Sequence, residues 1–184
     1  AFAGGDPVPV GALDQVVLAL PPTRLGAVLP WMDLPRDDSG ILNAHFVVPD
    51  SACLAKKPPV TGTIGSKTHW IFIRNDVVSL TISAADKLGL MEQDPEALIP
   101  VLWDETRRAL DLGDMKYTAA RINKERRATF DQSIAGVARR PAAKTPLKNM
   151  VLCGDATQTG LPATIEGAIR SGHTAARLIT RETA

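Results

Sequence analysis

Aromatic residues, cysteines and long apolar runs are all scarce in this sequence. Phe, Trp and Tyr make up 4% of the 184 residues, so aliphatic side chains must build most of the hydrophobic core. No apolar run approaches the roughly 20 residues that a membrane-spanning helix needs. Cys53 and Cys153 lie far apart, which excludes a disulfide framework and a cysteine-based zinc site, and we expect no bound metal. This cysteine usage fits a cytoplasmic protein.

An excess of one charge is also lacking. Lys and Arg number 21 against 20 Asp and Glu, so the net charge of +1 gives no general attraction for nucleic acid. The segment 121–148 is locally different, because eight basic and two acidic residues sum to +6. We interpret this segment as a solvated surface. The alternative is peripheral contact with anionic lipid headgroups at the inner membrane face.

The most informative stretch that is present is Val151–Gly172. An apolar strand is followed by a turn with Gly154 and Asp155, and then by a helix. Gly154 permits a close backbone approach or a positive φ, and Pro162 suits a first helical position. A helix N-terminus offers unpaired N–H groups and a partial positive charge, which favours an electron-rich or anionic ligand. The alternative is that this stretch is an ordinary strand–turn–helix unit without a ligand.

The predicted helix has a face of small and apolar residues at helical spacing. Its members are Ile165, Ala168, Ile169, Gly172, Ala175, Ala176 and Ile179. Such a face would let the helix pack closely on a sheet or ligand. Gly160 and Gly167 are expected to permit the same close packing.

Three sequence strings carry a family resemblance. GDATQTGLPATIEGAIRSG at 154–172 resembles the C-terminal flavin-binding motif of the FAD-dependent amine oxidase and phytoene desaturase superfamily. KERRATF at 124–130 and KTPLKNMVLCGD at 144–155 resemble its squalene-associated branch, the hydroxysqualene dehydroxylases. The resemblance covers nearly the whole chain. It implies an FAD-dependent oxidoreductase.

Enzymes of this kind begin with a strand–GxGxxG–helix unit that holds the ADP half of FAD. The sequence contains no such spacing. We therefore expect the chain to be the C-terminal part of a longer flavoenzyme. Its partner would be the N-terminal FAD-binding half of that enzyme. The chain alone should bind FAD weakly or not at all, lack activity and form a homo-oligomer.

The predicted fold class is α/β plus α+β. Residues 1–30 and 145–184 would complete a parallel, Rossmann-like FAD-binding domain. Residues 31–144 would form an inserted substrate-binding lobe with an antiparallel sheet, as in the family that the chain resembles.

In the terminal segments, the apolar run Gln15–Leu20 predicts a fully buried strand. Thr23–Leu29 predicts a short helix capped by Thr23. Pro141–Lys148 is expected to be a linker into the strand at Val151.

In the central segment, Ile41–Val48 alternates between apolar and polar residues, which predicts a strand with one covered face. Thr68–Arg74 and Val77–Ala84 flank Asn75-Asp76, which predicts a hairpin. The other expected elements are a long loop over Pro49–Gly65, a helix from Asp94 to about Leu112 kinked at Pro100, and a strand over Lys116–Lys124.

By resemblance, the cofactor-binding residues surround the turn and the helix start: Gly154, Asp155, Gly160, Pro162, Ala163, Thr164 and Ile165. Asp155 follows a strand end, where open α/β sheets bind ligands, and is expected to contact the ribityl region. The N–H groups of Ala163, Thr164 and Ile165 would face the flavin pyrimidine edge and stabilise negative charge on the reduced flavin. A turn Asp bonded to its own backbone is the alternative for Asp155.

Apolar residues of the predicted sheet are candidates for lining a water-poor substrate channel, and plain core is the alternative for each. They are Leu42, Phe46, Val78, Leu80 and Ile82. No catalytic residue is identified, because His45 and His69 are more simply structural or exposed than acid–base groups. Arg126 and Arg127 would pair with carboxylates or lie near an active-site entrance.

The resemblance implies an apolar isoprenoid substrate, specifically a triterpene such as hydroxysqualene. A carotenoid (phytoene-type) desaturase and a flavin amine oxidase are alternatives with the same flavin motif. The scarcity of aromatic residues disfavours amine oxidation, which usually needs an aromatic cage beside the flavin. A non-catalytic lipid-binding or interaction module is the alternative from a different functional class.

Overall fold

The computed structural model describes residues 5–182 and divides the chain into two compact units. Unit 1 combines Ala1–Asp37 with Phe130–Ala184, and unit 2 is Asp38–Thr129. The central unit is thus shorter at both ends than the predicted lobe of residues 31–144. The mixed α/β class predicted from the sequence is confirmed, whereas the assignment of the units to FAD and substrate stays a prediction.

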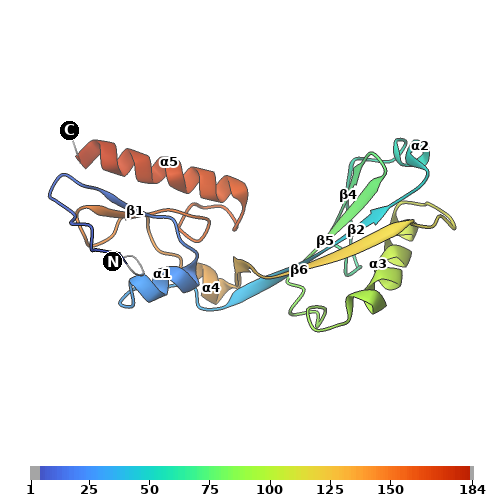
Figure 1. Cartoon of the computed structure of the whole chain (residues 1–184), viewed down its shortest axis with the longest axis horizontal. Coiled ribbons are helices and arrows are strands. Elements are labelled where there is room, and N and C mark those ends of the chain that lie inside the picture. The colour runs from blue at the N-terminus through green and yellow to red at the C-terminus, as the bar shows by residue number, and fades with distance from the viewer. Residues whose placement is uncertain (1–4, 183–184) are drawn as a thin grey trace. The chain divides into compact units, whose positions relative to one another are not determined.

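Unit 1 is built on two parallel strands, β1 (Val16–Leu18) and β7 (Met150–Leu152), with Val17 opposite Val151. Three helices belong to the same unit: α1 (Pro22–Val28), α4 (Ile134–Ala138) and α5 (Ile165–Glu182) (Figure 1). A small core forms where Leu25, Leu29 and Leu34 pack with Leu152. This core fixes β7 next to α1, and the chain then runs from β7 toward α5.

The strand β1 is shorter and more exposed than predicted. It spans three residues, and the side chain of Val17 is 45% exposed. A continuous apolar run is typical of a strand that is covered on both faces. Among residues 5–182, β1 pairs only with β7, so the prediction of full burial is wrong for this structure.

The helix α1 begins one residue earlier than predicted. Pro21 occupies the capping position, Pro22 follows at the first helical position, and no side chain caps the helix. Thr23 therefore lies inside the helix rather than at its cap. Proline suits a first helical position because the N–H group that it lacks would have no intrahelical partner there.

Unit 2 contains a five-stranded sheet in the order β3-β4-β5-β2-β6. The strands are β2 (Asp38–Val47), β3 (Val60–Gly62), β4 (Trp70–Arg74), β5 (Val77–Ser83) and β6 (Ala119–Phe130). Pairing is antiparallel along β3, β4, β5 and β2. The hairpin predicted at Asn75-Asp76 is confirmed, with Asn75 at a φ of 56°. Asparagine tolerates this left-handed region better than most residues.

The helix α3 (Pro95–Ala109) belongs to unit 2 (Figure 1). Its apolar residues pack into the core of this unit. The predicted start is confirmed, because the Asp94 carboxylate accepts a hydrogen bond from the N–H of Glu96 and Pro95 follows the cap. Leu98, Leu102 and Trp103 of α3 pack in one cluster with buried residues of β2 and β5. One face of the sheet is thereby covered.

Two other parts of unit 2 differ from the predictions. The expected loop Pro49–Gly65 contains α2 (Ser51–Leu54), capped by the Asp50 carboxylate, as well as β3. The strand β6 extends six residues beyond the predicted end at Lys124. Successive charged residues at 124–127 hide the strand pattern there. Lys124, Arg126 and Arg127 bind partners outside their own strand.

The indole of Trp103 gives a test of this core. Its Nε1 donates to the backbone oxygen of Met115 at 3.0 Å, and its ring packs against Phe46 and Tyr117. Trp103→Phe should lower the free energy of unfolding by about 1–3 kcal/mol, because the carbonyl loses its donor. Urea unfolding followed by circular dichroism measures this, with the exposed Trp31→Phe as the matched control. Equal unfolding free energies for the two variants would contradict the packing described.

Candidate functional site

The candidate site begins where the chain leaves β7. The N–H of Cys153 extends the parallel ladder by bonding to the backbone oxygen of Leu18 at 3.0 Å. Gly154 then turns the chain with a φ of 120°, which confirms the expected positive φ. Its N–H donates to the Ser171 hydroxyl of α5 at 2.7 Å. The turn therefore lies at the carboxyl ends of two parallel strands, the usual place for ligands in α/β sheets.

The helix α5 begins at Ile165, later than the predicted start at Pro162. Thr164 caps it: its hydroxyl accepts from the N–H of Gly167 at 3.1 Å, and its carbonyl accepts from the N–H of Ala168. A threonine cap explains the later start. Pro162 lies before the helix, and its backbone oxygen would be 2.9 Å from a Cβ placed at Gly167. Close packing at Gly167, expected from the sequence, is thus present.

The packed face of α5 differs from the predicted one. Gly167, Ser171 and Ala175 are the buried residues, whereas Ile165 is 83% and Ile169 is 52% exposed. The prediction combined two neighbouring stripes of the helix, one of small residues and one of larger apolar residues. Both kinds of residue occur at helical spacing. The small residues bring α5 close to β7, and the Ser171 hydroxyl is satisfied by Gly154 and Ala168.

Arg140 organises the turn between β7 and α5, and the sequence did not single it out for this role. Its guanidinium donates to the backbone oxygens of Asp155, Thr157 and Leu161 at 2.9, 2.5 and 2.6 Å. It also bonds to the Thr159 hydroxyl at 3.1 Å. One side chain therefore holds four successive parts of the loop that precedes α5.

Arg140 is 7% exposed, and its guanidinium carbon lies 5.4 Å from the centre of the Phe130 ring. Burial lowers the pKa of Arg140, and the charge of Asp155 opposes that shift. Its Nε is buried without a partner among the described residues. The sequence carries no local signal for this role, because an arginine in a basic segment resembles any solvated basic residue.

The predicted cofactor residues lie together around this loop. Asp155 is half-buried, and no hydrogen bond to its carboxylate is recorded among residues 5–182. The N–H of Ala163 is already donated to the Gln132 side chain at 2.8 Å, outside the helix. Thr164 and Ile165 are exposed at the helix start. Gly160 has a φ of 74° with open space around it, so its role is in the turn rather than in close packing.

This arrangement fits the polar parts of FAD. No hydrogen bond of the half-buried Asp155 carboxylate is recorded within residues 5–182, and a carboxylate can accept from ribityl hydroxyls. Within the described residues, no acceptor is recorded for the N–H groups of Ile165 and Glu166 in the first turn of α5. Such groups favour electron-rich ligand atoms. Cys153, beside the turn, is half-buried, and burial raises the pKa of its thiol.

The candidate substrate-lining residues are in the closed core of unit 2. Leu42, Phe46, Val78, Leu80 and Ile82 all have an exposed fraction of 0%. They pack in one cluster with the residues of α3. In this structure they are core residues, which was the alternative. Their contact with substrate stays a prediction.

The two histidines weighed as acid–base groups occupy different places in the sheet. His45 lies in β2, and its Nδ1 is 2.8 Å from the Ser79 hydroxyl of β5. The Nδ1 of His69 accepts from the N–H of Ser83 at 3.0 Å, which ties it to the end of β5. The ring of His69 is therefore bonded to the backbone, whereas the ring of His45 pairs with another side chain.

The basic residues of the KERRATF segment pair within unit 2. Arg126 binds the Glu92 carboxylate at 2.6 Å, and this bond lowers the pKa of Glu92. Arg127 lies 3.6 Å from Asp38. The ammonium group of Lys124 donates to the backbone oxygens of Met91 and Gln93. Lys124 and Arg126 therefore hold the segment before α3, whereas Arg127 is paired with β2. The carboxylates of Glu92 and Asp38 offset part of the positive charge that lipid headgroups would need.

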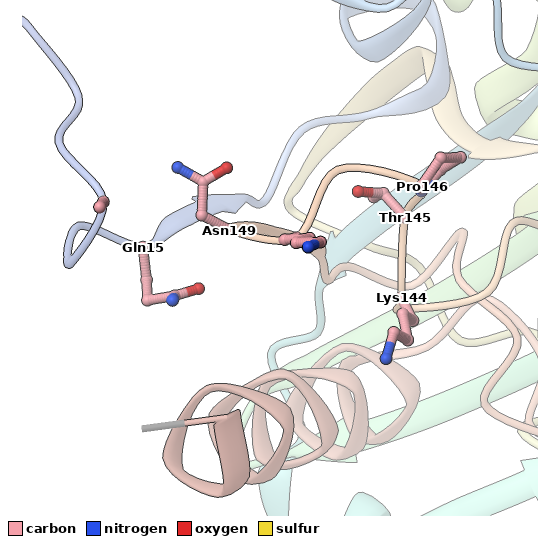
Figure 2. A pocket seen from close by; sticks show the side chains of 7 residues that line it. Gln15, Lys144, Thr145, Pro146 and Asn149 are labelled. Carbon is pink, nitrogen blue, oxygen red and sulfur yellow. The ribbon is translucent and has the colours of Figure 1, made fainter. Parts of the chain in front are cut away.

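A shallow pocket in unit 1 is lined by Gln15, Lys144 and Asn149, among others (Figure 2). Gln15 and Asn149 immediately precede β1 and β7. The pocket therefore lies at the amino ends of the parallel strands, away from the turn at Gly154. Ligands of open α/β sheets bind at the opposite ends, so this pocket is not the candidate cofactor site.

No helix in the described part of the chain is long and apolar enough to cross a membrane. The same residues contain no cluster of His, Cys, Asp and Glu that could hold a metal ion.

Residues 4–180 match the sequence profile of a family described as "Flavin containing amine oxidoreductase". The chain is 39% identical over 97% of its length to a hydroxysqualene dehydroxylase of Rhodopseudomonas palustris. It is 37% identical to proteins of the same name from Zymomonas mobilis and Sinorhizobium fredii, over 96% and 98% of its length. The chain spans 41–42% of the length of these relatives.

A crystal structure of a putative protoporphyrinogen oxidase from Exiguobacterium sp. 255-15 has a similar fold. The TM-score is 0.61 at 12% sequence identity, and the match covers 92% of this chain and 41% of the other. At this identity the likeness concerns the fold alone.

Proposed function

The chain belongs to the flavin containing amine oxidoreductase family, and from that premise we propose that it forms the carboxyl-terminal part of an FAD-dependent oxidoreductase. The proposed substrate is an apolar triterpene alcohol such as hydroxysqualene. The observation that carries this proposal is the 37–39% identity to three hydroxysqualene dehydroxylases over almost the whole chain. In unit 1, the strand–turn–helix arrangement around Gly154 supports a flavin contact.

Replacing a hydroxyl group by hydrogen consumes an electron pair and protons and releases water. FAD, when bound and reduced, supplies the electrons for such chemistry. The chain's own residues would bind and orient: the Asp155 carboxylate would accept from ribityl hydroxyls, and the exposed start of α5 would favour electron-rich flavin atoms. Arg140 is proposed as a positioning residue, because it holds the loop that carries these groups.

Asp155→Ala in the full-length protein that carries this chain tests the cofactor role. We expect FAD to be retained at least about tenfold more weakly, because a hydrogen bond to a charged group is worth about 1.5–3 kcal/mol. The fold should persist, since no hydrogen bond of the carboxylate within residues 5–182 is recorded. Bound flavin is measured by absorbance after gel filtration.

The matched control is Asp6→Ala, an exposed aspartate of the same unit. It should retain flavin like the unmodified protein. Equal flavin retention by both variants would remove Asp155 from the site.

A further inference from the structure

The strands β3 and β4 and the turn between them expose apolar side chains at one edge of the unit 2 sheet. We call residues 60–74 the edge hairpin. Ile64, in the turn, is fully exposed to solvent. On the strands, Val60 is 49%, Trp70 is 50% and Phe72 is 40% exposed. Exposed apolar side chains that gather on one element indicate a contact site for a protein or a membrane.

Strand pairing places the three strand residues on one face of the edge hairpin. Val60 lies opposite Phe72, and Gly62 lies opposite Trp70. A Cβ at Gly62 would be 3.3 Å from the indole, so the glycine leaves room for this ring. Ile71, between the two aromatic residues, is buried in the core of unit 2. The exposed side chains therefore lie on the face of the hairpin that points away from this core.

The turn of the edge hairpin is closed without help from the side chain of Ile64. The N–H of Thr63 donates to the backbone oxygen of His69 at 3.1 Å. The Ser66 hydroxyl donates to the backbone oxygen of Thr68 at 2.8 Å. Because these bonds join residues of the turn itself, the isoleucine has no packing role there. A partner outside unit 2 would give this side chain a role.

The charges of the edge hairpin and its flanks are all positive. Residues 55–75 contain four cations and neither Asp nor Glu, which gives a local charge of +4. The cations are Lys56, Lys57, Lys67 and Arg74. Lys67 lies before β4, Arg74 ends this strand, and both are exposed. Cations beside an apolar surface favour a partner that presents anionic groups next to hydrocarbon, as an anionic membrane does.

Acidic side chains of unit 2 lie away from the exposed face of the edge hairpin. The residues that β5 and the paired part of β2 add to the same face include no Asp or Glu. Glu125, like Arg121, belongs to β6 at the opposite edge of the sheet. The Glu105 carboxylate approaches the turn only at the buried Thr68, at 3.5 Å from its hydroxyl. Acidic groups therefore leave the positive charge beside the exposed apolar side chains largely in place.

We propose that the edge hairpin docks the protein on an anionic membrane surface. Ile64 and Trp70 enter the boundary between the acyl chains and the headgroups, where amphipathic indole rings are favoured. Lys67 and Arg74 contact lipid phosphates, because long basic side chains can keep their stems on apolar surface and extend their charged ends to the headgroups. The docking surface is separate from the basic segment 121–148.

The positive charge favours a membrane over two other partners. A second copy of the chain, placed hairpin against hairpin, would bring two segments of charge +4 together, which like-charge repulsion disfavours. A free phosphate ion would use the cations but would leave the exposed apolar side chains in water. An anionic membrane offers negative charge and an apolar phase at the same surface.

The test is flotation of the full-length protein with vesicles of phosphatidylcholine, with or without phosphatidylglycerol. The anionic vesicles should bind at least about fivefold more protein, and high salt should remove this difference. Ile64→Asp should lower binding to anionic vesicles at least about tenfold. Lys67→Glu should lower it about fivefold or more and leave binding to neutral vesicles unchanged. No binding, or equal binding to both vesicles, would overturn the proposal.

Two matched variants keep the same chemical changes away from the edge hairpin. Val101→Asp changes a residue of α3 that is 47% exposed, and Lys148→Glu changes an exposed lysine of unit 1. Both should bind vesicles like the unmodified protein. A loss as large as that of Ile64→Asp and Lys67→Glu would overturn the assignment to the hairpin.

Tryptophan fluorescence of the 184-residue chain locates the contact. In a Trp31→Phe background, anionic vesicles should shift the emission of Trp70 to shorter wavelength, whereas Trp103 is 5% exposed and should change little. Trp70→Phe should abolish the shift. Emission that stays unchanged with vesicles would overturn the proposed contact.

Other occupants of the edge hairpin give different results. Vesicle binding by the 184-residue chain but not by the full-length protein would mean that the rest of the enzyme covers the hairpin. Dissociation of a dimer by Ile64→Asp in sedimentation, with unchanged flotation, would assign the hairpin to a second copy. Either result would overturn the proposal. The vesicles contain no triterpene and the readouts need no flavin, so failure here leaves the proposed oxidoreductase function untouched.

Discussion

Arg140→Met is expected to lower the FAD affinity of the full-length protein by about a hundredfold or more. Methionine keeps much of the side-chain volume but removes every donor to the loop. The backbone oxygens of Asp155, Thr157 and Leu161 then lose their partner, and an unsatisfied buried acceptor costs about 1–3 kcal/mol. Because Thr157 is 3% exposed, water cannot readily replace the guanidinium there. The loop should lose the shape that presents Asp155.

The effect is measured as the amount of flavin that each protein molecule retains after gel filtration. Thermal unfolding is a second readout. The neighbouring Arg139→Met is the control, since the Arg139 side chain is 39% exposed and forms a 3.9 Å ion pair with Asp33. Arg140→Lys should recover little, because one ammonium cannot replace the planar fork of donors. Normal flavin content in folded Arg140→Met protein would exclude the positioning role.

The 184-residue chain alone is expected to bind FAD orders of magnitude more weakly than the full-length protein, and to be colourless. Its sequence contains no GxGxxG unit, so the adenosine and most of the pyrophosphate contacts have no counterpart in the chain. Losing several charge-assisted hydrogen bonds at about 1.5–3 kcal/mol each produces such a reduction. Exposed contacts at the start of α5 contribute only about 1 kcal/mol apiece.

The same chain should self-associate. Val17 on β1 and Ile165 and Ile169 on α5 leave apolar surface exposed in unit 1. Exposed apolar patches favour association. Calorimetric titration with FAD and sedimentation velocity measure the two properties together. A yellow, monomeric preparation with stoichiometric flavin would contradict both expectations.

Elements with local sequence signals could be predicted well. The alternation of β2 and β5, the turn at Asn75-Asp76 and the cap at Asp94 each depend on residues close in sequence. The family could be predicted for a similar reason, because its motif around Gly154 and Asp155 is one continuous string. Local patterns carry this information without knowledge of the tertiary fold.

Features that depend on distant residues could not be predicted. Arg140 reaches partners 15–21 residues away, and the His45–Ser79 pair joins residues 34 apart. Their proximity follows from strand register and loop path, which a single sequence does not encode locally. The buried stripe of α5 was missed because periodicity alone does not decide which of two neighbouring apolar stripes meets β7. In β6, charged residues with tertiary partners concealed the end of the strand.

We propose that this chain completes a flavoenzyme that reduces an isoprenoid alcohol. The most direct measurement mixes the full-length protein, loaded with FAD and reduced under anaerobic conditions, with hydroxysqualene. We predict that flavin absorbance returns in step with the formation of squalene, one molecule for each flavin reoxidised. Flavin that stays reduced in the presence of hydroxysqualene, or that reoxidises without formation of squalene, would contradict the account.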